Sequence, residues 1–245
     1  MAWLPEIQRF WDIDAVTYDR SASHHPTSPS ERAAWLAALE RLLPPAPASV
    51  LDMGAGTGFL SLQAAVLGHR VTAVDLAPAM LARLEAKASA AGLSIDGRQG
   101  DAASPPDGPF DAVIERHLLW TLPDPLGALS AWRRVAPDGR LVLLESSWGS
   151  GAAPIDQLRS RILDRWQRLR RVPPDHHGSY PADIQAGLPM GGGPSADRLI
   201  EAVTEAGWRA PRLVRLRDVE WAYAEGRPAF ERLLGTRPRF AVVAG

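Results

Sequence analysis

The sequence of 245 residues lacks cysteine altogether. That absence excludes disulfides, thiolate metal sites, iron–sulfur clusters and a cysteine nucleophile. Lysine occurs only once, as Lys87 in the helix-like stretch LARLEAKASA, so neither Schiff-base chemistry nor a pyridoxal enzyme is expected. Runs of about 18 apolar residues are missing, and residues 1–20 lack the continuous apolar core of a secretion signal. We therefore expect a cytoplasmic protein without a membrane partner.

An excess of either charge is also missing. The chain has 27 Lys and Arg against 28 Asp and Glu, so its net charge of −1 gives no general attraction to nucleic acid or to an anionic membrane. Arginines gather in residues 155–171, which leaves nucleic acid or an acidic substrate as an alternative. Acids alternate with them, however, and we interpret this segment as a solvated helix face. The length and the 46% hydrophobic content suit one large α/β domain.

A glycine-rich stretch, LDMGAGTGFLSL, covers residues 51–62. An apolar run ends at Asp52, and glycines at 54, 56 and 58 precede a helical pattern, which predicts a strand, a tight turn and a helix. Such a turn lets a ligand approach the main chain, and the helix amino terminus faces that ligand. The glycine spacing differs from the GxGxxG of nicotinamide-binding proteins, which disfavours a nucleotide-dependent oxidoreductase but leaves it as an alternative.

Apolar runs alternate with helical patterns along the rest of the chain. We expect strands over residues 49–53, 70–75, 94–99, 110–115 and 140–146, with helices over 58–67, 78–91 and 125–135 between them. This order predicts an α/β, doubly wound, mostly parallel sheet, which strands near 213–217 and 240–243 extend to seven strands.

Helices are also expected outside this core. One covers residues 6–19, ending near Tyr18, and a second starts at Ser28 with a capping box completed by Glu31. We expect a single domain, residues 1–245, whose parts are a helical lid (1–44), a cofactor-binding core (45–148), a cap inserted after strand five (149–194), and a carboxyl-terminal helix with closing strands (195–245).

The motifs, in this order, resemble the class I S-adenosylmethionine-dependent methyltransferases. The agreement is good over roughly residues 45–148, where the glycine turn, Asp75, the Gly100-Asp101-Ala102 stretch and the fourth strand all have counterparts. The turn at 134–139 departs slightly, because Asp138 stands where the family more often has a second glycine. The general pattern resembles bacterial small-molecule and natural-product methyltransferases. This resemblance implies a Rossmann-like fold, S-adenosylmethionine as cofactor and S-adenosylhomocysteine as product.

The resemblance also implies a set of cofactor-binding residues. The turn backbone would contact the methionine part, Asp75 would accept the ribose hydroxyls, and Asp101 with Ala102 would bind the adenine. Asp75 would suit any dinucleotide fold as well, and Asp101 has the alternative role of a loop cap. The complete set comprises Tyr18, Gly54, Ala55, Gly56, Asp75, Leu76, Met80, Asp101, Ala102 and Arg116.

Acceptor-binding residues should follow the carboxyl ends of the strands, where ligands of such sheets bind. His117 follows strand four directly, and we interpret it as a general base or an acceptor contact, with a loop-capping histidine as the alternative. His69 lies at the opposite end and is predicted to be structural. Further candidate acceptor contacts, which solvated loops or packing would also explain, are His24, Trp120, Trp148, His176, His177 and Tyr180.

Two departures from known motifs narrow the acceptor. Arg116 occupies the position of an aspartate in magnesium-dependent catechol-type relatives, so we predict no metal. The stretch ERHLLW does not match the Asp/Asn-Pro-Pro-aromatic signature of nucleic-acid amino-methylating enzymes. We therefore expect transfer of a methyl group to an O, N or C atom of a small molecule, by a monomer or homodimer. The alternative is a protein of the same fold that binds the cofactor and catalyses a cyclisation or another rearrangement.

Overall fold

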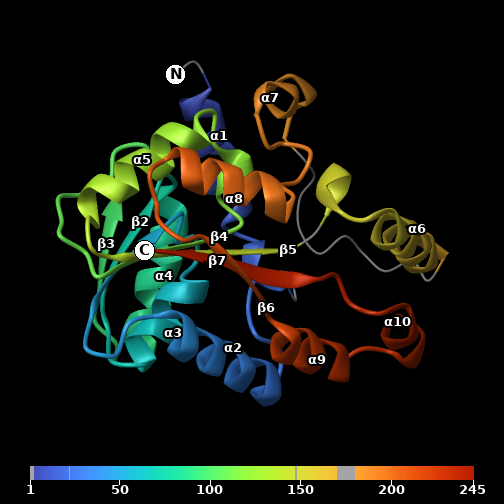
Figure 1. The fold of residues 1–245 in the computed structure, drawn as a ribbon. Helices are drawn as coiled ribbons and strands as arrows, with labels where there is room; N and C mark the ends of the chain where they lie inside the picture. The colour runs from blue at the N-terminus through green and yellow to red at the C-terminus, as the bar shows by residue number, and fades with distance from the viewer. Residues whose placement is uncertain (1–2, 22, 147, 170–179) are drawn as a thin grey trace.

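The computed structural model describes residues 3–21, 23–146, 148–169 and 180–245. They form a seven-stranded sheet with helices on both faces (Figure 1). The strand order is β3-β2-β1-β4-β5-β7-β6, and β7 is antiparallel to both of its neighbours while the central strands are parallel. The predicted doubly wound, mostly parallel, seven-stranded sheet is confirmed.

The strands agree closely with the predicted ranges, and their bounds are β1 (Ser49–Met53), β2 (Arg70–Asp75), β3 (Ile95–Gln99), β4 (Ala112–Arg116), β5 (Arg140–Ser146), β6 (Arg212–Arg215) and β7 (Arg239–Ala244). The largest differences concern β4 and β6. β4 starts two residues later than predicted, because Asp111 turns its carboxylate back to accept the Ser49 N–H, at 2.7 Å. β6 ends early because a helix begins at Arg217.

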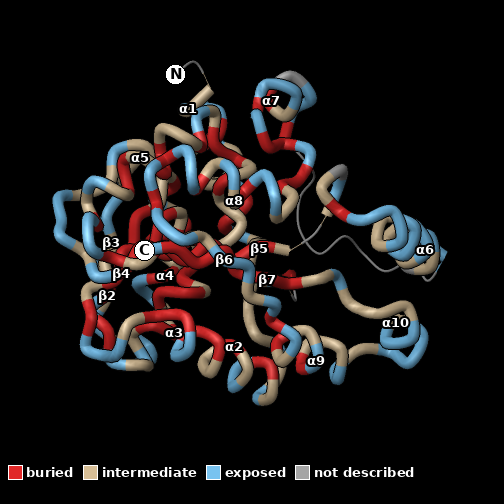
Figure 2. Tube along the Cα trace, in the orientation of Figure 1, coloured by how far each residue is buried: buried red, intermediate tan, exposed pale blue. Residues whose placement is uncertain are grey.

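Helices cover the sheet in two layers (Figure 1). On one face lie α2 (Pro29–Leu42), α3 (Phe59–Val66), α4 (Pro78–Ala90) and α9 (Arg217–Glu225). The other face carries α5 (Pro125–Val135) and α8 (Ala196–Glu205). Each layer buries its own core, one around Trp132 and Leu199 and the other around Trp35 and Leu60, and Figure 2 shows the buried segments at the sheet.

The amino-terminal helix is shorter than predicted. α1 covers Leu4–Asp14, and Tyr18–Arg20 forms a separate 3-10 turn, η1. The break comes where Thr17 donates its N–H to the Asp14 carbonyl, at 2.8 Å, and two β-branched residues weaken the helix.

The predicted capping box of α2 is confirmed in part. Ser28 Oγ accepts the Glu31 N–H, at 3.1 Å, but the Glu31 carboxylate accepts from the Thr27 N–H and hydroxyl instead of Ser28.

The segment after β5 leaves the sheet. It contains η3 (Gly149–Gly151), α6 (Pro154–Leu169) and α7 (Ala182–Gly187), whereas His176 and His177 lie outside the described residues. α6 packs on α10 (Ala229–Leu234), with the rings of Trp166 and Phe230 4.7 Å apart. Sequence analysis missed both α9 and α10. Among the described residues no helix is long and apolar enough to cross a membrane.

Candidate active site

The glycine turn connects β1 to α3 in the predicted way. Gly54, Gly56 and Gly58 all have positive φ angles, of 66°, 53° and 90°, which side chains resist. A Cβ on Gly54 would also lie 2.7 Å from Leu118. The turn is tied to β2, because the Ala55 N–H donates to the Val74 carbonyl at 3.0 Å. The glycines are therefore required by the backbone torsions of the turn.

A cavity opens at the carboxyl ends of β1, β2 and β4. The predicted cofactor residues that line it come from the lid, the turn and the strand ends, and they are Tyr18, Gly54, Gly56, Asp75, Leu76, Met80, Asp101, Ala102 and Arg116. His117 lines the same cavity. Ala55 instead packs its side chain against Ala73 and Leu84, outside the lining. The cavity thus joins nearly all the predicted cofactor residues to the predicted catalytic histidine.

Asp75 lies where β2 ends, beside the glycine turn. Its carboxylate accepts the Gly56 N–H at 2.8 Å and the Ala77 N–H at 2.9 Å, so both oxygens are held in place. Burial raises the pKa of Asp75 to about 6. A carboxylate has about four acceptor positions, so two remain for hydroxyl donors from a ligand. This arrangement fits a ribose.

The part of the cavity that is predicted to bind adenine is formed by apolar side chains and one polar loop. Met80 is buried and packs with Ala15 and Ala77. Asp101 Oδ1 accepts the Ala103 N–H at 3.0 Å, so Asp101 does cap its loop, and the Ala102 carbonyl accepts from Trp132 Nε1 at 2.8 Å. These bonds hold the loop against the cavity. An apolar slot edged by a carboxylate fits a purine ring with an exocyclic amine.

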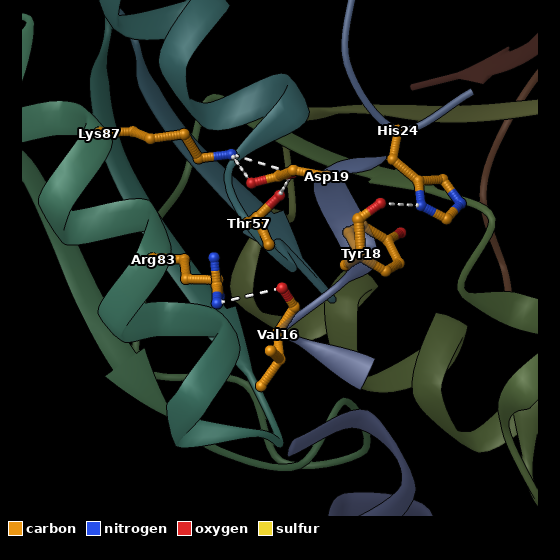
Figure 3. Close-up of polar contacts among 7 residues, drawn as sticks. All are labelled: Val16, Tyr18, Asp19, His24, Thr57, Arg83 and Lys87. Atoms are coloured by element: carbon orange, nitrogen blue, oxygen red, sulfur yellow. Dashed lines mark hydrogen bonds and ion pairs between the residues drawn. The ribbon is translucent and has the colours of Figure 1, made fainter. Parts of the chain in front are cut away.

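The lid segment is fastened over the glycine turn (Figure 3). Asp19 accepts the hydroxyl of Thr57, within the turn, at 2.6 Å, and contacts Lys87 Nζ on α4 at 3.0 Å. Arg83, also on α4, donates to the Val16 carbonyl at 3.3 Å. The glycine turn and α4 therefore hold the lid.

Tyr18 is one of the lid residues that line the cavity. Its ring lies 3.9 Å from where a Cβ on Gly56 would stand, and burial raises its pKa to about 12, so its hydroxyl keeps its proton. His24 stacks on this ring, with centroids 3.8 Å apart, and its Nδ1 lies 2.8 Å from the Tyr18 carbonyl (Figure 3). His24 thus supports Tyr18 from behind and does not line the cavity.

His117 lines the cavity directly after β4. Its φ of 59° is rare for a residue with a side chain. Its Nδ1 is 2.7 Å from Glu145 Oε2, on β5, and the Glu145 side chain is fully buried while His117 keeps 27% of its side chain exposed. A second buried acid, Glu115, accepts the Leu118 N–H at 2.8 Å and so holds the loop that follows His117. We call His117 and Glu145 the dyad.

The electrostatics of the dyad follow from its burial. Burial raises the pKa of Glu145 to about 8, and burial together with the Glu145 charge raises that of Glu115 well above its usual range. The pKa of His117 is lowered by burial and by Arg116, Arg239 and Arg237. When the Glu145 carboxyl group is ionised, His117 Nδ1–H donates to it. His117 Nε2 then carries no proton and can act as a base.

Arg116 points to the other face of the sheet from the dyad. Its guanidinium lies 4.0 Å from the centroid of the Phe59 ring, and one terminal nitrogen donates to the Ser23 carbonyl, on the lid, at 2.5 Å. Among the described residues no three His, Asp or Glu side chains are placed to hold a metal ion.

The remaining predicted acceptor residues form an aromatic cluster beside the cavity. Trp11 Nε1 donates to the Tyr180 hydroxyl at 2.6 Å, and the Tyr180 ring lies 5.6 Å from Trp120, which lies 5.2 Å from Trp148. Of these four, only Trp11 lines the cavity. The cluster joins the lid to the segments around α7, so it forms a wall behind the cavity.

Sequence analysis missed three parts of the site. It did not single out Glu145 or Glu115 as site residues, although an acid inside an apolar strand run is a signal, because such residues are rarely buried without a partner or a role. It also missed Trp11 and the contacts of Asp19 with Thr57 and Lys87, because no local sequence pattern predicts them.

Comparisons with known proteins agree with this geometry. Residues 51–143 match the family model of a methyltransferase domain. The ubiquinone biosynthesis O-methyltransferase of Xanthomonas axonopodis pv. citri is 35% identical over 139 residues, which cover 55% of each chain. The demethylmenaquinone methyltransferase of Thermus thermophilus is 42% identical over 113 residues, which cover 44% of this chain and 51% of that protein. The chain therefore spans about half the length of these curated relatives.

A solved structure extends the similarity to the whole fold. A geranyl diphosphate methyltransferase, in complex with GPP and sinefungin, has a TM-score of 0.64 at 15% identity and covers 100% of this chain and 99% of its own. The fold is thus that of the Rossmann-like methyltransferases. These similarities agree with the class I S-adenosylmethionine-dependent methyltransferase that the sequence leads us to expect, with S-adenosylmethionine as its cofactor.

Proposed function

We propose that this protein transfers the methyl group of S-adenosylmethionine to an O, N or C atom of a small molecule, with His117 as the general base. One observation carries the proposal. The cavity that holds nearly all the predicted cofactor residues ends at a histidine hydrogen-bonded to a buried glutamate, with Nδ1 and Oε2 2.7 Å apart. A base at that position can take the proton of a phenol, an enol or an ammonium group.

The cavity residues bind and orient the cofactor in this proposal. Asp75 holds the ribose hydroxyls, Asp101 and Ala102 hold the adenine, and Tyr18 with the glycine turn covers the methionine part. The cofactor supplies an electrophilic methyl group on a sulfonium. Because such a group reacts readily once aligned, the protein contributes mainly proximity and exclusion of water.

The dyad controls the proton of the acceptor. Glu145 holds the imidazole by its Nδ1, so that Nε2 is directed away from the buried carboxylate. The proton that the acceptor loses passes to Nε2, and the resulting imidazolium is stabilised by the Glu145 carboxylate. Glu115 holds the loop that begins after His117, through the Leu118 N–H. These roles predict that the rate of methyl transfer rises as Glu145 ionises.

The acceptor is proposed to be a small molecule of secondary metabolism, handled in the cytoplasm by a monomer or homodimer. The curated relatives are named for ubiquinone biosynthesis and for demethylmenaquinone. A cyclisation is the second candidate, because the [4+2]-cyclase SpnF has a TM-score of 0.57 at 18% identity and covers 87% of this chain.

Two measurements test the proposal. Calorimetric titration with S-adenosylhomocysteine and with NADH should show tight binding of the first alone, and tighter binding of NADH would contradict the cofactor assignment. Transfer of labelled methyl from S-adenosylmethionine to a panel of phenols, quinols and amines should then be lost in His117→Ala. Cyclisation of an added polyene by the protein, without loss of the methyl group from the bound S-adenosylmethionine, would favour the second candidate.

A further inference from the structure

Two arginines lie on one face of the sheet, opposite to the face of the dyad but at the same edge, where β4 and β5 end and β7 begins. Arg116 ends β4 opposite Leu144, and Arg239 begins β7 opposite Ser146, so β5 alone separates them. Strands are about 4.8 Å apart, so their backbones are separated by roughly 10 Å and their long side chains can reach a common point. The Arg116 guanidinium lies over Phe59, and that of Arg239 lies 4.4 Å from the ring centroid of Tyr223.

Neither arginine has an acid partner among the residues that the structure describes. Arg239 is only 8% exposed, and the buried Nε of each side chain has no hydrogen-bond partner. The acids nearby make other bonds. Glu31 accepts from Thr27, and Glu145 pairs with His117.

Glu220, the acid that contacts the backbone of β7, is engaged as well. It forms an ion pair with Arg215 and accepts the backbone N–H of Arg239. It makes no hydrogen bond to the Arg239 guanidinium in the part of the chain that the structure describes. A buried guanidinium without an anion is costly, because the charge loses its hydration and gains no partner. Proteins keep such groups where a ligand completes the pairing. Two of them together indicate a ligand with negative charge.

These charges act on the reaction centre. Arg116 lines the cavity beside His117, and both Arg116 and Arg239 lower the pKa of His117, so both lie within electrostatic range of the imidazole. We infer that Arg116 and Arg239 form a subsite for an oxyanion, a carboxylate or phosphate group carried by the methyl acceptor. This inference rests on the proposed function, since it defines the chemical class of the acceptor.

The chemistry of the subsite suits this ligand. A guanidinium binds a carboxylate or phosphate through two parallel hydrogen bonds, and two guanidiniums can share one such group. Neutralising the two positive charges would also make His117 more basic, because they hold its pKa down. An anionic acceptor would therefore improve the base that activates it, whereas a neutral analogue would not.

The cofactor has a carboxylate of its own, which is the competing source of the anion. The glycine turn follows β1, and β4 and β5 lie between β1 and β7. Arg239 is therefore placed on the side of the dyad away from the turn, where the methionine part is expected. For this reason we assign the subsite to the acceptor, with Arg239 as its most specific residue.

The test uses inorganic phosphate as probe and the protein saturated with S-adenosylhomocysteine, so that the cofactor carboxylate is already in place. The imidazole signals of His117, identified in NMR spectra by their loss in His117→Asn, should shift saturably with phosphate. Arg239→Gln and Arg116→Gln should raise the half-saturating concentration at least about tenfold, as loss of a charge-assisted pair predicts. Arg134→Gln, which removes an exposed arginine on α5, is the matched control and should titrate like the wild type.

Three results would overturn the inference. They are a linear, unsaturated shift, an unchanged titration in Arg239→Gln, and phosphate binding that disappears when S-adenosylhomocysteine is added. In the last case, Arg239→Gln should weaken S-adenosylhomocysteine but not 5′-methylthioadenosine, which would assign the pair to the cofactor carboxylate. Cofactor binding that survives while phosphate fails to bind would refute the subsite and leave the proposed function standing.

A folding control separates binding from structure. Because the Arg239 charge is unpaired, Arg239→Met should unfold at a Tm no lower than that of the wild type, and Arg239→Lys should keep part of the phosphate response. A clearly lower Tm for Arg239→Met would give this side chain a structural role and contradict the inference.

Discussion

The two ends of the cavity are built in different ways. At the cofactor end, a short turn and two strand ends present backbone groups and one carboxylate, Asp75, from stretches that are each continuous in sequence. At the proposed acceptor end, His117, which follows β4, pairs with Glu145 on β5, whose side chain is fully buried. The first end is suited to a ligand that is bound through the main chain, and the second to a ligand that is selected by charged side chains.

This contrast indicates which residues determine the specificity for each ligand. Backbone contacts at the glycine turn depend on φ angles, so they tolerate few changes and serve one cofactor. The acceptor end depends on buried ionisable groups whose pKa values shift with their neighbours. A single substitution there should change the chemistry while leaving the cofactor in place.

The largest effect is expected at His117. If it is the base, His117→Ala should lower the rate of methyl transfer by roughly 10²-fold or more, with little change in affinity for S-adenosylhomocysteine. Burial raises the pKa of Glu145 to about 8, so the wild-type rate should rise with pH toward that value, and the rise should vanish in the variant. The pH dependence of kcat and calorimetry check these expectations.

His117→Asn distinguishes a base from a positioning residue. If the side chain only orients the acceptor, the asparagine should restore much of the rate, and KM should suffer more than kcat. Wild-type turnover by His117→Ala at every pH would make this residue part of the loop structure alone. That outcome would leave the acceptor end without an assigned base among the described residues.

At the cofactor end, Asp75→Ala should weaken binding of S-adenosylhomocysteine roughly tenfold or more, because charge-assisted hydrogen bonds worth about 1.5–3 kcal/mol are lost. The pKa of Asp75 is raised to about 6, so wild-type affinity should fall as the pH drops through that value. Calorimetry of both proteins at several pH values measures the effect. Asp96→Ala, an exposed acid on β3, is the control, and equal affinities for wild type and Asp75→Ala would refute the ribose assignment.

Glu145 should make stability depend on pH. Its folded pKa of about 8 lies above the unfolded value of about 4.3, so the folded state holds the proton more tightly and loses stability as pH rises between these values. His117, with a lowered folded pKa, acts in the opposite direction only below about pH 6.5. Between about pH 6.5 and 8 the wild type should therefore lose about 1–2 kcal/mol relative to Glu145→Gln.

Urea unfolding of both proteins across that range measures this difference. The glutamine cannot ionise, so its contribution should not change with pH. A constant free-energy difference between the two proteins would show that Glu145 is already ionised throughout the range, and would weaken its role in the dyad.

The smallest effect is expected at the lid. Asp19→Ala removes the contacts with Thr57 and Lys87, but the ion pair is partly exposed, and such pairs contribute about 0–1 kcal/mol. Binding of S-adenosylhomocysteine should therefore weaken about two- to fivefold. Lys87→Met should weaken it less, because the Thr57 hydrogen bond remains.

Hydrogen exchange gives an independent measurement of the lid. Residues 6–25 should exchange more slowly when S-adenosylhomocysteine is bound, and Asp19→Ala should reduce that protection. Exchange that is the same with and without the ligand would show that this segment does not close over the cofactor.

The sequence predicts the cofactor end better than the acceptor end for a physical reason. Strand, turn and helix at residues 49–66 follow from local apolar periodicity and from glycines that the torsions require. The dyad follows from the register of β4 and β5, which brings Glu145 to His117 across 28 positions. The contacts of the lid also depend on tertiary structure, because Asp19 reaches Lys87 only when α4 has packed beside the lid.

The central claim is that one cavity joins the cofactor residues to the dyad. A crystal structure with S-adenosylhomocysteine tests it most directly. The account predicts the ribose hydroxyls on Asp75, the adenine beside Asp101 and Ala102, and the sulfur directed toward His117. A ligand bound elsewhere, or one whose sulfur points away from the His117–Glu145 dyad, would contradict it.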